Sequence, residues 1–298
     1  MARETALERV VAVGGVAARR PAHPVARFLR RYPPGAAGGA VIWAMLLMGV
    51  AAPWVAPYNP VANDFANMFQ PPSAAHWFGT DAFGRDVLSR IIYGARTAMI
   101  VGFGASVLGA TVGAVVGVTS AYFGGWTDLA VQRLVDIMIS FPIIILALAV
   151  VAIIGSGTDK LILAIALSFV PRAERVVRAS ALSVRETPYV EAARAIGAGH
   201  LRIIFRHMAP NVVAPYLVML TSFLGQAILL EASLSFLGLG VSEPTPAWGL
   251  MLRGAAVDFA TRAPWMAVFP GLAISVAVLA FNIFGDALRD ALDPRLRT

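Results

Sequence analysis

Only a few side chains in this sequence are of the types that carry out covalent or metal chemistry. The chain has no cysteine, which excludes disulfides, thiol catalysis and cysteine-based metal sites. Its four histidines form no H-E-x-x-H arrangement, which argues against a zinc enzyme. The single lysine, Lys160, follows Asp159, so the chain contains no G-x-x-x-x-G-K-[ST] nucleotide loop. If the protein works with ATP, another chain must bind the nucleotide.

The most distinctive residue pattern lies in the segment 186–211. Thr187 and Pro188 are suited to the N-cap and the first position of a helix, and the alanines that follow favour helix. Gly197 would end or turn this helix, and a second short helix is expected to stop before Pro210. Two short helices with small residues between charges could dock into a groove of a soluble partner. An ordinary loop is the alternative.

Glu231 is the one acidic residue left within an expected membrane span when Asp136 is counted with the inner segment at about 122–136. An ionisable group in lipid costs about 2.5–3.5 kcal/mol on insertion scales, so we expect it to face the helix bundle or a water-filled path. Glu231 is therefore a candidate residue of a translocation path. The alternative is an interfacial acid with ordinary solvation.

A second charged group lies in the polar stretch between the first two apolar runs. Thr80 or Asp81 could cap a short helix there, and Arg85 and Asp86 could pair across the subunit or contact an external protein. A solvated surface helix is the alternative. Metal binding is disfavoured because the acids are interleaved with arginines.

The composition requires that these residues be positioned by membrane-spanning helices. Of the 298 residues, 58% are hydrophobic and 14% are charged, against roughly 25% charged in a typical soluble domain. Lipid replaces water as the solvent of spanning helices, which explains the low share of charged residues. Since a span needs about 20 residues, we predict an all-α membrane protein of six transmembrane helices. They lie at about 38–57, 97–121, 133–154, 160–172 (extending toward 177), 212–235 and 265–285.

The distribution of arginine predicts the orientation. With both termini inside, the inner segments hold 18 of the 24 basic residues, which is the expected cytoplasmic excess. In a soluble protein the net charge of +7 would suggest nucleic acid, but here cytoplasmic arginines account for it. We therefore divide the chain into a basic cytoplasmic tail (1–37), a first span with an outer segment (38–96), a core of five helices (97–285) with a cytoplasmic loop (172–211), and a cytoplasmic C-terminal tail (286–298).

A stripe of small residues follows the second span. Ala105, Gly109, Gly113 and Gly117 recur every four residues and so share one helix face. Such a face lets another helix backbone approach closely, and we assign it packing and no chemistry.

The segment 186–211 resembles the signature of permease subunits of ATP-binding-cassette importers. That signature is E-A-A, three residues, Gly, nine residues, and then I-x-L-P. His207 stands in place of the generic isoleucine and Ala209 in place of the generic leucine, although the histidine is typical of the peptide-transporter branch. The stretches 76–96, 231–240 and 286–297 resemble the dipeptide and oligopeptide permease C subunits. The matching positions are Glu191, Ala192, Ala193, Gly197 and Pro210.

This resemblance extends from about residue 40 to the end and implies a type I importer permease fold with both termini inside. It implies a multi-pass protein of the bacterial cytoplasmic membrane that couples ATPases to peptide transport through 191–197 and binds no cofactor itself. ATP and magnesium would belong to partner chains: a second permease, one or two cytoplasmic ATPases, and a periplasmic or lipid-anchored substrate-binding protein. A nickel or glutathione importer of the same architecture is the alternative. A secondary carrier is a further one, although we see no clear internal repeat.

Overall fold

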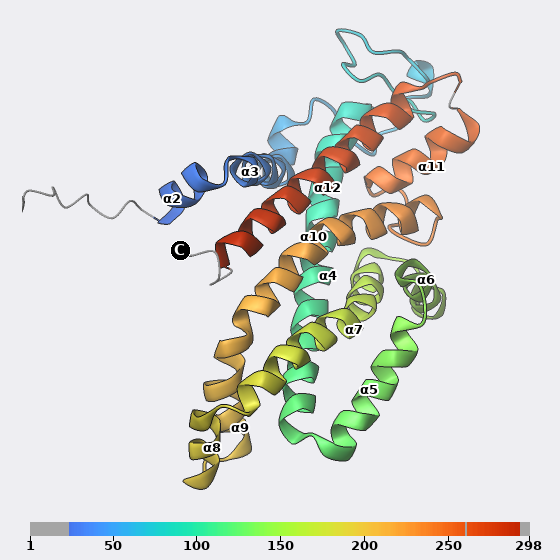
Figure 1. Cartoon of the computed structure of the whole chain (residues 1–298). Helices are drawn as coiled ribbons and strands as arrows, with labels where there is room; N and C mark the ends of the chain where they lie inside the picture. The colour runs from blue at the N-terminus through green and yellow to red at the C-terminus, as the bar shows by residue number, and fades with distance from the viewer. Residues whose placement is uncertain (1–23, 260, 293–298) are drawn as a thin grey trace, which may run out of the picture.

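Figure 1 shows the computed structural model of the chain, which describes residues 24–259 and 261–292. Every regular element in these ranges is helical, apart from one isolated bridge between Thr80 and Asp86. The basic tail predicted at 1–37 lies outside the described residues up to position 23, and its remainder is helical. The helices are α2 (Pro24–Arg31), α3 (Pro33–Val55), α4 (Val87–Phe123), α5 (Gly125–Ile139), α6 (Ile143–Ile154), α7 (Thr158–Arg185), α8 (Pro188–Ala195), α9 (His200–Ile203), α10 (Val213–Phe236), α11 (Trp248–Asp258) and α12 (Trp265–Leu292), with a short 3-10 turn at Phe65–Asn67.

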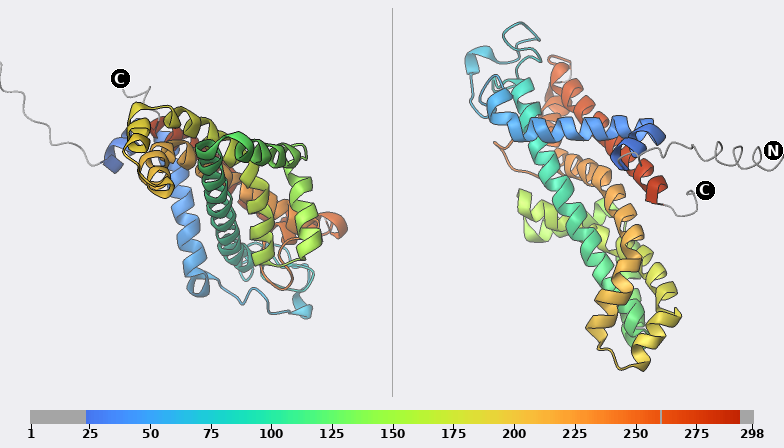
Figure 2. Two further views of the ribbon diagram at one scale, coloured as in Figure 1. Left: turned by 90° about the horizontal axis from the view of Figure 1, so that it is seen from below. Right: turned by 90° about the vertical axis from the view of Figure 1, so that its left-hand side faces the viewer.

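The long helix α4 is the centre of the arrangement. It packs along α7 and α10, and α3 crosses it on the side where α12 also lies (Figure 2). Glycines allow these close crossings: a Cβ at Gly38 would lie 2.7 Å from the Ala280 carbonyl oxygen of α12, and one at Gly49 would lie 3.1 Å from the Arg96 Cα of α4. The outer segment and α11 lie at one end of the molecule, and α8 and α9 lie at the other (Figure 1).

The small-residue stripe of α4 faces α7. A Cβ at Gly109 would lie 2.7 Å from the Ala166 carbonyl oxygen, and one at Gly117 would lie 2.7 Å from the Glu174 carbonyl oxygen. Ala105 is fully buried in the same face. Backbone therefore meets backbone along this contact, which places the polar second half of α7 firmly against α4.

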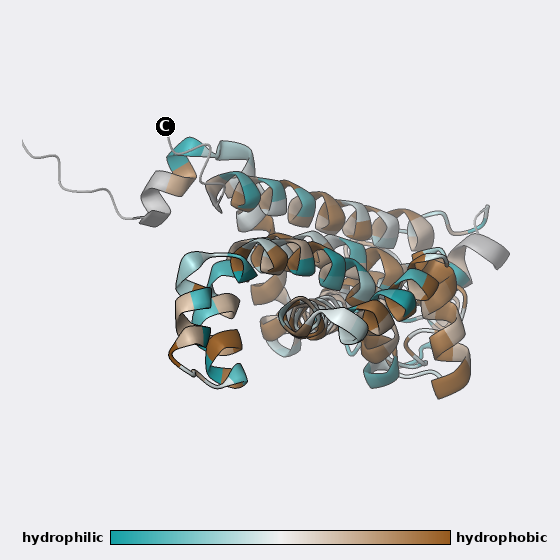
Figure 3. Ribbon diagram, turned by 60° about the horizontal axis from the view of Figure 1, so that its bottom comes forward, coloured by the Kyte–Doolittle hydropathy of each residue, from teal (hydrophilic) through white to brown (hydrophobic). Residues whose placement is uncertain are grey.

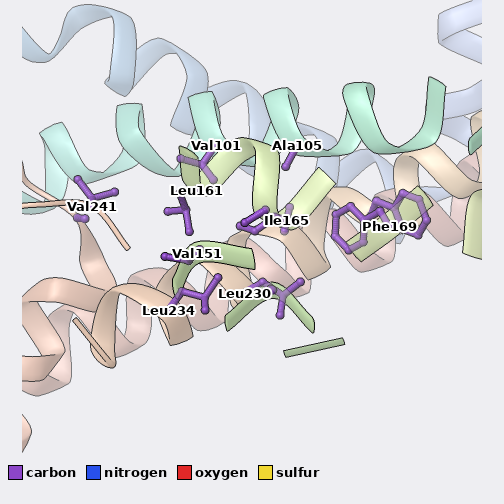
Figure 4. Packing of buried hydrophobic residues seen from close by; sticks show 14 of the residues in the cluster. Val101, Ala105, Val151, Leu161, Ile165, Phe169, Leu230, Leu234 and Val241 are labelled. Atoms are coloured by element: carbon purple, nitrogen blue, oxygen red, sulfur yellow. The ribbon is translucent and has the colours of Figure 1, made fainter. Parts of the chain in front are cut away.

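A hydrophobic core forms where α4, α6, α7 and α10 meet (Figure 4). Val101, Ile165 and Leu230 are buried there, and the rings of Phe169 and Phe223 stack with centroids 4.2 Å apart. Elsewhere many large apolar side chains stay exposed along the long helices. Figure 3 shows that hydrophobic residues are frequent along these helices. Exposed apolar surface on helices of this length is expected where lipid or another membrane chain is the neighbour.

Within residues 24–259 and 261–292, four helices are long and apolar enough to span a membrane: α3, α4, α12, and the continuous helix His200–Phe236 that contains α10. The predicted span at 133–154 is instead two helices, α5 and α6, bent by 96°, which could make a fifth. The break lies at Pro142, which precedes α6 with an extended backbone (φ −53°, ψ 136°). α7 does not qualify as a span, since charged residues crowd its second half. The predicted count of six is thus not reached on length and apolarity.

Candidate functional site

In the segment 186–211, which we call the inner segment after its predicted side of the membrane, α8 starts at Pro188 as the sequence predicts. Thr187 holds the extended backbone of an N-cap, but its hydroxyl donates to the Val184 carbonyl oxygen instead of capping α8. After α8 the chain turns at Gly197, whose φ of +76° is a left-handed conformation that favours glycine. A Cβ at Gly197 would have nothing within 4 Å, so the turn faces open space.

One face of α8 packs inward and the other is open. Val190 and Ala193 are buried against the residues that follow, while Glu191 and Ala192 are exposed together with Gly197. The residues that match the importer signature therefore lie mostly on the free surface. Large apolar side chains surround them: Ile196 is 84% exposed, Leu201 71% and Phe205 65%. A small helix with an exposed apolar rim is the geometry of a docking surface for another protein.

The second short helix does not stop before Pro210, contrary to the sequence-based expectation. α9 passes through a π-helical turn (Ile204–Met208) and a 3-10 turn (Ala209–Val212) directly into α10. Pro210 lies in the first turn of the 3-10 stretch, where its missing N–H is not needed. The His207 carbonyl oxygen, left free by the change in winding, accepts from the Asn211 amide at 2.7 Å.

Side-chain contacts tie this segment to the end of α4. The Tyr122 hydroxyl lies 2.7 Å from His200 Nδ1, and the Arg194 guanidinium lies over the Tyr122 ring at 5.2 Å. Arg185 Nη1 donates to the Ala121 carbonyl oxygen at 2.8 Å. A force applied to α8 or α9 would therefore reach α4 and α7 as well as α10.

Charged side chains also hold α5 against α7. Arg178 donates through Nε and Nη2 to the two carboxylate oxygens of Asp128, at 2.7 and 2.5 Å. Gln132 donates to Glu174, which is fully buried, at 2.7 Å. Two-pronged pairs of this kind fix geometry as well as charge.

The charged residues in the segment between α3 and α4 form a buried network, and not the solvated surface helix that was the alternative expectation. Asp81 accepts from Arg85 Nε at 2.6 Å, and Arg85 Nη1 reaches Glu243 at 3.0 Å. The expected cap is also different: Asp86, and neither Thr80 nor Asp81, caps α4 by accepting from the Ser89 N–H at 2.8 Å. Glu243, 49% exposed, had no motif to mark it in the sequence because it lies 158 residues from Arg85.

Glu231 is buried inside the protein, with 1% of its surface exposed. One of its carboxylate oxygens accepts from the Ser235 hydroxyl at 2.9 Å, and the other has no hydrogen-bond partner. The motif 231–240 around it is a tight fold: a Cβ at Gly238 would collide with the Arg253 guanidinium, and one at Gly240 with Ser235. Among the described residues, no group of three or more His, Asp or Glu is placed to hold a metal ion.

Comparisons with known proteins assign two parts of the chain. Residues 109–298 match the family described as binding-protein-dependent transport system inner membrane components. Residues 21–72 match the N-terminal transmembrane domain of oligopeptide transport permease C.

Several proteins are similar over nearly the full length. A putative peptide transport system permease protein of Brucella abortus is 42% identical, covering 94% of each chain. The glutathione transport system permease protein GsiD of Escherichia coli is 40% identical, covering 99% of this chain and 97% of its own. The dipeptide transport system permease protein DppC of Alkalihalophilus pseudofirmus is 44% identical, covering 88% and 86%.

A solved structure has the same fold at low sequence identity. A chain of the MetNI methionine ABC transporter, in an inward-facing conformation, aligns with a TM-score of 0.51 at 22% identity. The alignment covers 68% of this chain and 96% of the other.

Proposed function

The chain belongs to the binding-protein-dependent transport system inner membrane components, the permease subunits of ATP-binding-cassette importers, and from this premise we propose that its cargo is short peptides. As a member of that family it is a transport subunit of the bacterial inner membrane, not an ion-coupled carrier. The cargo proposal is supported by relatives named for peptide, dipeptide and glutathione transport, since glutathione is itself a peptide. The three relatives described above are named for peptide, glutathione and dipeptide transport, and none of these three is named for nickel.

The inner segment is the proposed site of coupling to ATPases. The observation that carries this is the open face of α8, where Glu191, Ala192 and Gly197 are exposed beside an apolar rim. Ala193 has the complementary role of fixing α8 to its own chain, and Pro210 lies where the segment joins α10. Nucleotide-driven closure of the ATPases would move α8, and the contacts at Tyr122 would pass the movement to α4.

We propose that two such permeases enclose the path, with ATPases docked at the α8 end and a substrate-binding protein at the α11 end. Both termini would then lie in the cytoplasm, and ATP with magnesium would be bound by the partner chains. To reach six spans, α7 and the α5–α6 pair would each cross the bilayer, with the arginines of α7 facing water or protein. Lipid would cover the remaining apolar surface.

At the outer end, we propose that Asp81, Arg85 and Asp86 act by holding the outer segment in shape for the binding protein. All three are buried, and Glu243 is the exposed member through which the network could touch a partner. Glu231 remains a proposed path residue, although cargo could reach its carboxylate only after a rearrangement that uncovers it.

The proposal is tested first by isolating the complex. The tagged protein at native expression is extracted in mild detergent, and the proteins that co-purify are identified. A second permease with one or two ATPases is expected, and the reconstituted complex should import dipeptides or glutathione with ATP. Recovery of the chain alone, repeated after cross-linking in the intact membrane, would refute the importer assembly.

Coupling is tested by changing Gly197 to Asp. The left-handed backbone and the open surface at this position lead us to expect normal membrane insertion with loss of transport. Gly199→Ala is the matched control, because Gly199 has an ordinary φ of −64° and equally open surroundings. Retained uptake by Gly197→Asp at normal expression would contradict the coupling role.

A further inference from the structure

One arginine of α7 lacks the carboxylate partner that the others have. α7 carries four arginines, and Arg172 makes only a long contact from Nη1 to the Gln226 side-chain oxygen of α10, at 3.5 Å. No carboxylate among the described residues lies within salt-bridge distance of it, and its side chain is exposed. The other three are paired: Arg175 with Asp136 at 2.5 Å, Arg178 with Asp128 at 2.5 Å, and Arg185 with Glu186 at 2.9 Å.

The neighbours of Arg172 place it at the level of the apolar spans. The adjacent residue, Ala173, packs against Gly113, which lies about 12 Å from the expected inner end of that span at residue 121, taking 1.5 Å per residue. On the other side, Gln226 lies about 20 Å along α10 from Val213 by the same measure. An unpaired cation at this level must face water, an anion or another protein, because lipid would be costly.

Water has room beside Arg172. A small cavity of about 40 Å³ lies between Pro171, Arg172 and the turn that joins α5 to α6, where Phe141 also contributes. This volume exceeds the 10–15 Å³ or so that one water needs. The turn between α5 and α6 thus leaves space beside the guanidinium that is large enough for a water, and Ser168 and Arg172 are the polar residues that line it.

We propose that Arg172 and Gln226 form a binding position for a carboxylate of the cargo on the translocation path. The inference rests on the proposed function, because a peptide with a free C-terminus carries such a carboxylate. The planar guanidinium can donate two parallel hydrogen bonds to a carboxylate, and the Gln226 amide adds a neutral donor. The cargo carboxylate would not be held tightly, because the site has one cation and is open. Weak binding suits a position that the cargo must leave.

The absence of cysteine from the chain makes accessibility directly measurable. In the complete importer in inside-out vesicles, Val176→Cys is exposed to a charged methanethiosulfonate reagent with and without excess alanylalanine. Val176 is exposed and lies four residues from Arg172 on the same side of α7, and this substitution leaves the guanidinium in place. Labelling that alanylalanine slows, and that alanylalanine amide does not, is expected. Leu163→Cys is the control, because Leu163 lies nine residues before Arg172 and so on the opposite face of α7.

Three outcomes would overturn the proposal. Val176→Cys could label only after denaturation in SDS, could label equally with and without the peptide, or could become accessible only when the second permease is removed. The last result would show that this face of α7, with Arg172, contacts the partner chain instead.

Uptake by substituted importers provides the second measurement. Loss of a charge-assisted hydrogen bond predicts that Arg172→Gln lowers ATP-driven dipeptide uptake by about tenfold or more, whereas Arg172→Lys, which keeps the charge, loses less. Co-purification of the second permease and the ATPases with both variants checks that the complex is intact. Full uptake by Arg172→Gln would refute the site. An unsubstituted complex that imports no peptide would refute the cargo proposal instead, and labelling of Val176→Cys would still report on the path.

Discussion

The close contact between α4 and α7 can be tested at Gly113. A Cβ added at this position would lie 2.5 Å from the Ala173 Cβ, 2.7 Å from the Val170 carbonyl oxygen and 2.9 Å from the Glu174 amide nitrogen. Two of these three atoms belong to backbone, which cannot move aside by changing rotamer. The two helices must therefore separate, so that the stability lost is at the upper end of the usual range for overpacking, about 3 kcal/mol.

The same helix offers a matched control. A Cβ at Gly104 would meet only the side chain of Ile162, at 3.2 Å or more, and that side chain can yield. Alanine gains about 1 kcal/mol of helix propensity at either position, so this gain cancels in the comparison of Gly104→Ala with Gly113→Ala. We expect Gly104→Ala to be neutral or stabilising, Gly113→Ala to be destabilising, and Gly113→Leu to be worse.

Thermal unfolding of the detergent-solubilised protein, followed by size-exclusion chromatography after heating, measures the difference. At roughly 2–4 °C per kcal/mol, the loss of about 3 kcal/mol in Gly113→Ala corresponds to a Tm lower by about 6–12 °C, and Gly113→Leu should lower the Tm further. Equal Tm values for the two alanine variants would show that the α4–α7 contact is looser than the structure has it, and would refute the reasoning.

Three further substitutions follow from the site geometry. Gly197→Ala should reduce transport by about tenfold while Gly199→Ala does not, because only the first must hold a left-handed backbone; equal uptake would remove that explanation. Asp86→Ala should lower stability by about 1–2 kcal/mol through loss of the cap on α4, seen as a lower Tm, and an unchanged Tm would refute the cap. Glu231→Gln should preserve the Ser235 hydrogen bond and the fold; reduced uptake would then support a path role, and unchanged uptake with unchanged Tm would reject it.

Hydropathy predicted where helices lie better than how they are arranged. The runs at 38–57 and 265–285 correspond to α3 and α12. The run at 133–154 is just as apolar, yet it bends at Pro142, whereas Pro53 and Pro171 stay inside their helices. A proline allows a break without requiring one, so the outcome depends on the neighbouring helices. The residue before Pro142 is biased away from helix, which was the available signal.

At the candidate site too, local features could be predicted from the sequence and long-range contacts could not. The turn at Gly197 could be predicted, because it depends on the local conformational freedom of glycine. The pairing of Arg85 with Glu243 and the isolation of Arg172 could not, since they depend on segments far apart in the sequence. Whether a charged residue has a partner is a property of the packed helices, and the sequence alone offers no pattern that reports it.

The uninterrupted winding from His200 to Phe236 has a mechanical consequence. With 37 residues, this helix follows a path about 55 Å long, less the small change in rise at its π and 3-10 turns, and it curves along that path (Figure 1). Its lower end carries the surface of α9, and its upper end carries Glu231 and the loop that follows. Because the curvature shortens the distance between the ends, pivoting the helix by about 5° around its upper end displaces the lower end by somewhat less than about 5 Å. A displacement of a few ångströms at one end of the helix therefore corresponds to a small rotation at the other end. This coupling is possible because the winding continues through Pro210 without a hinge.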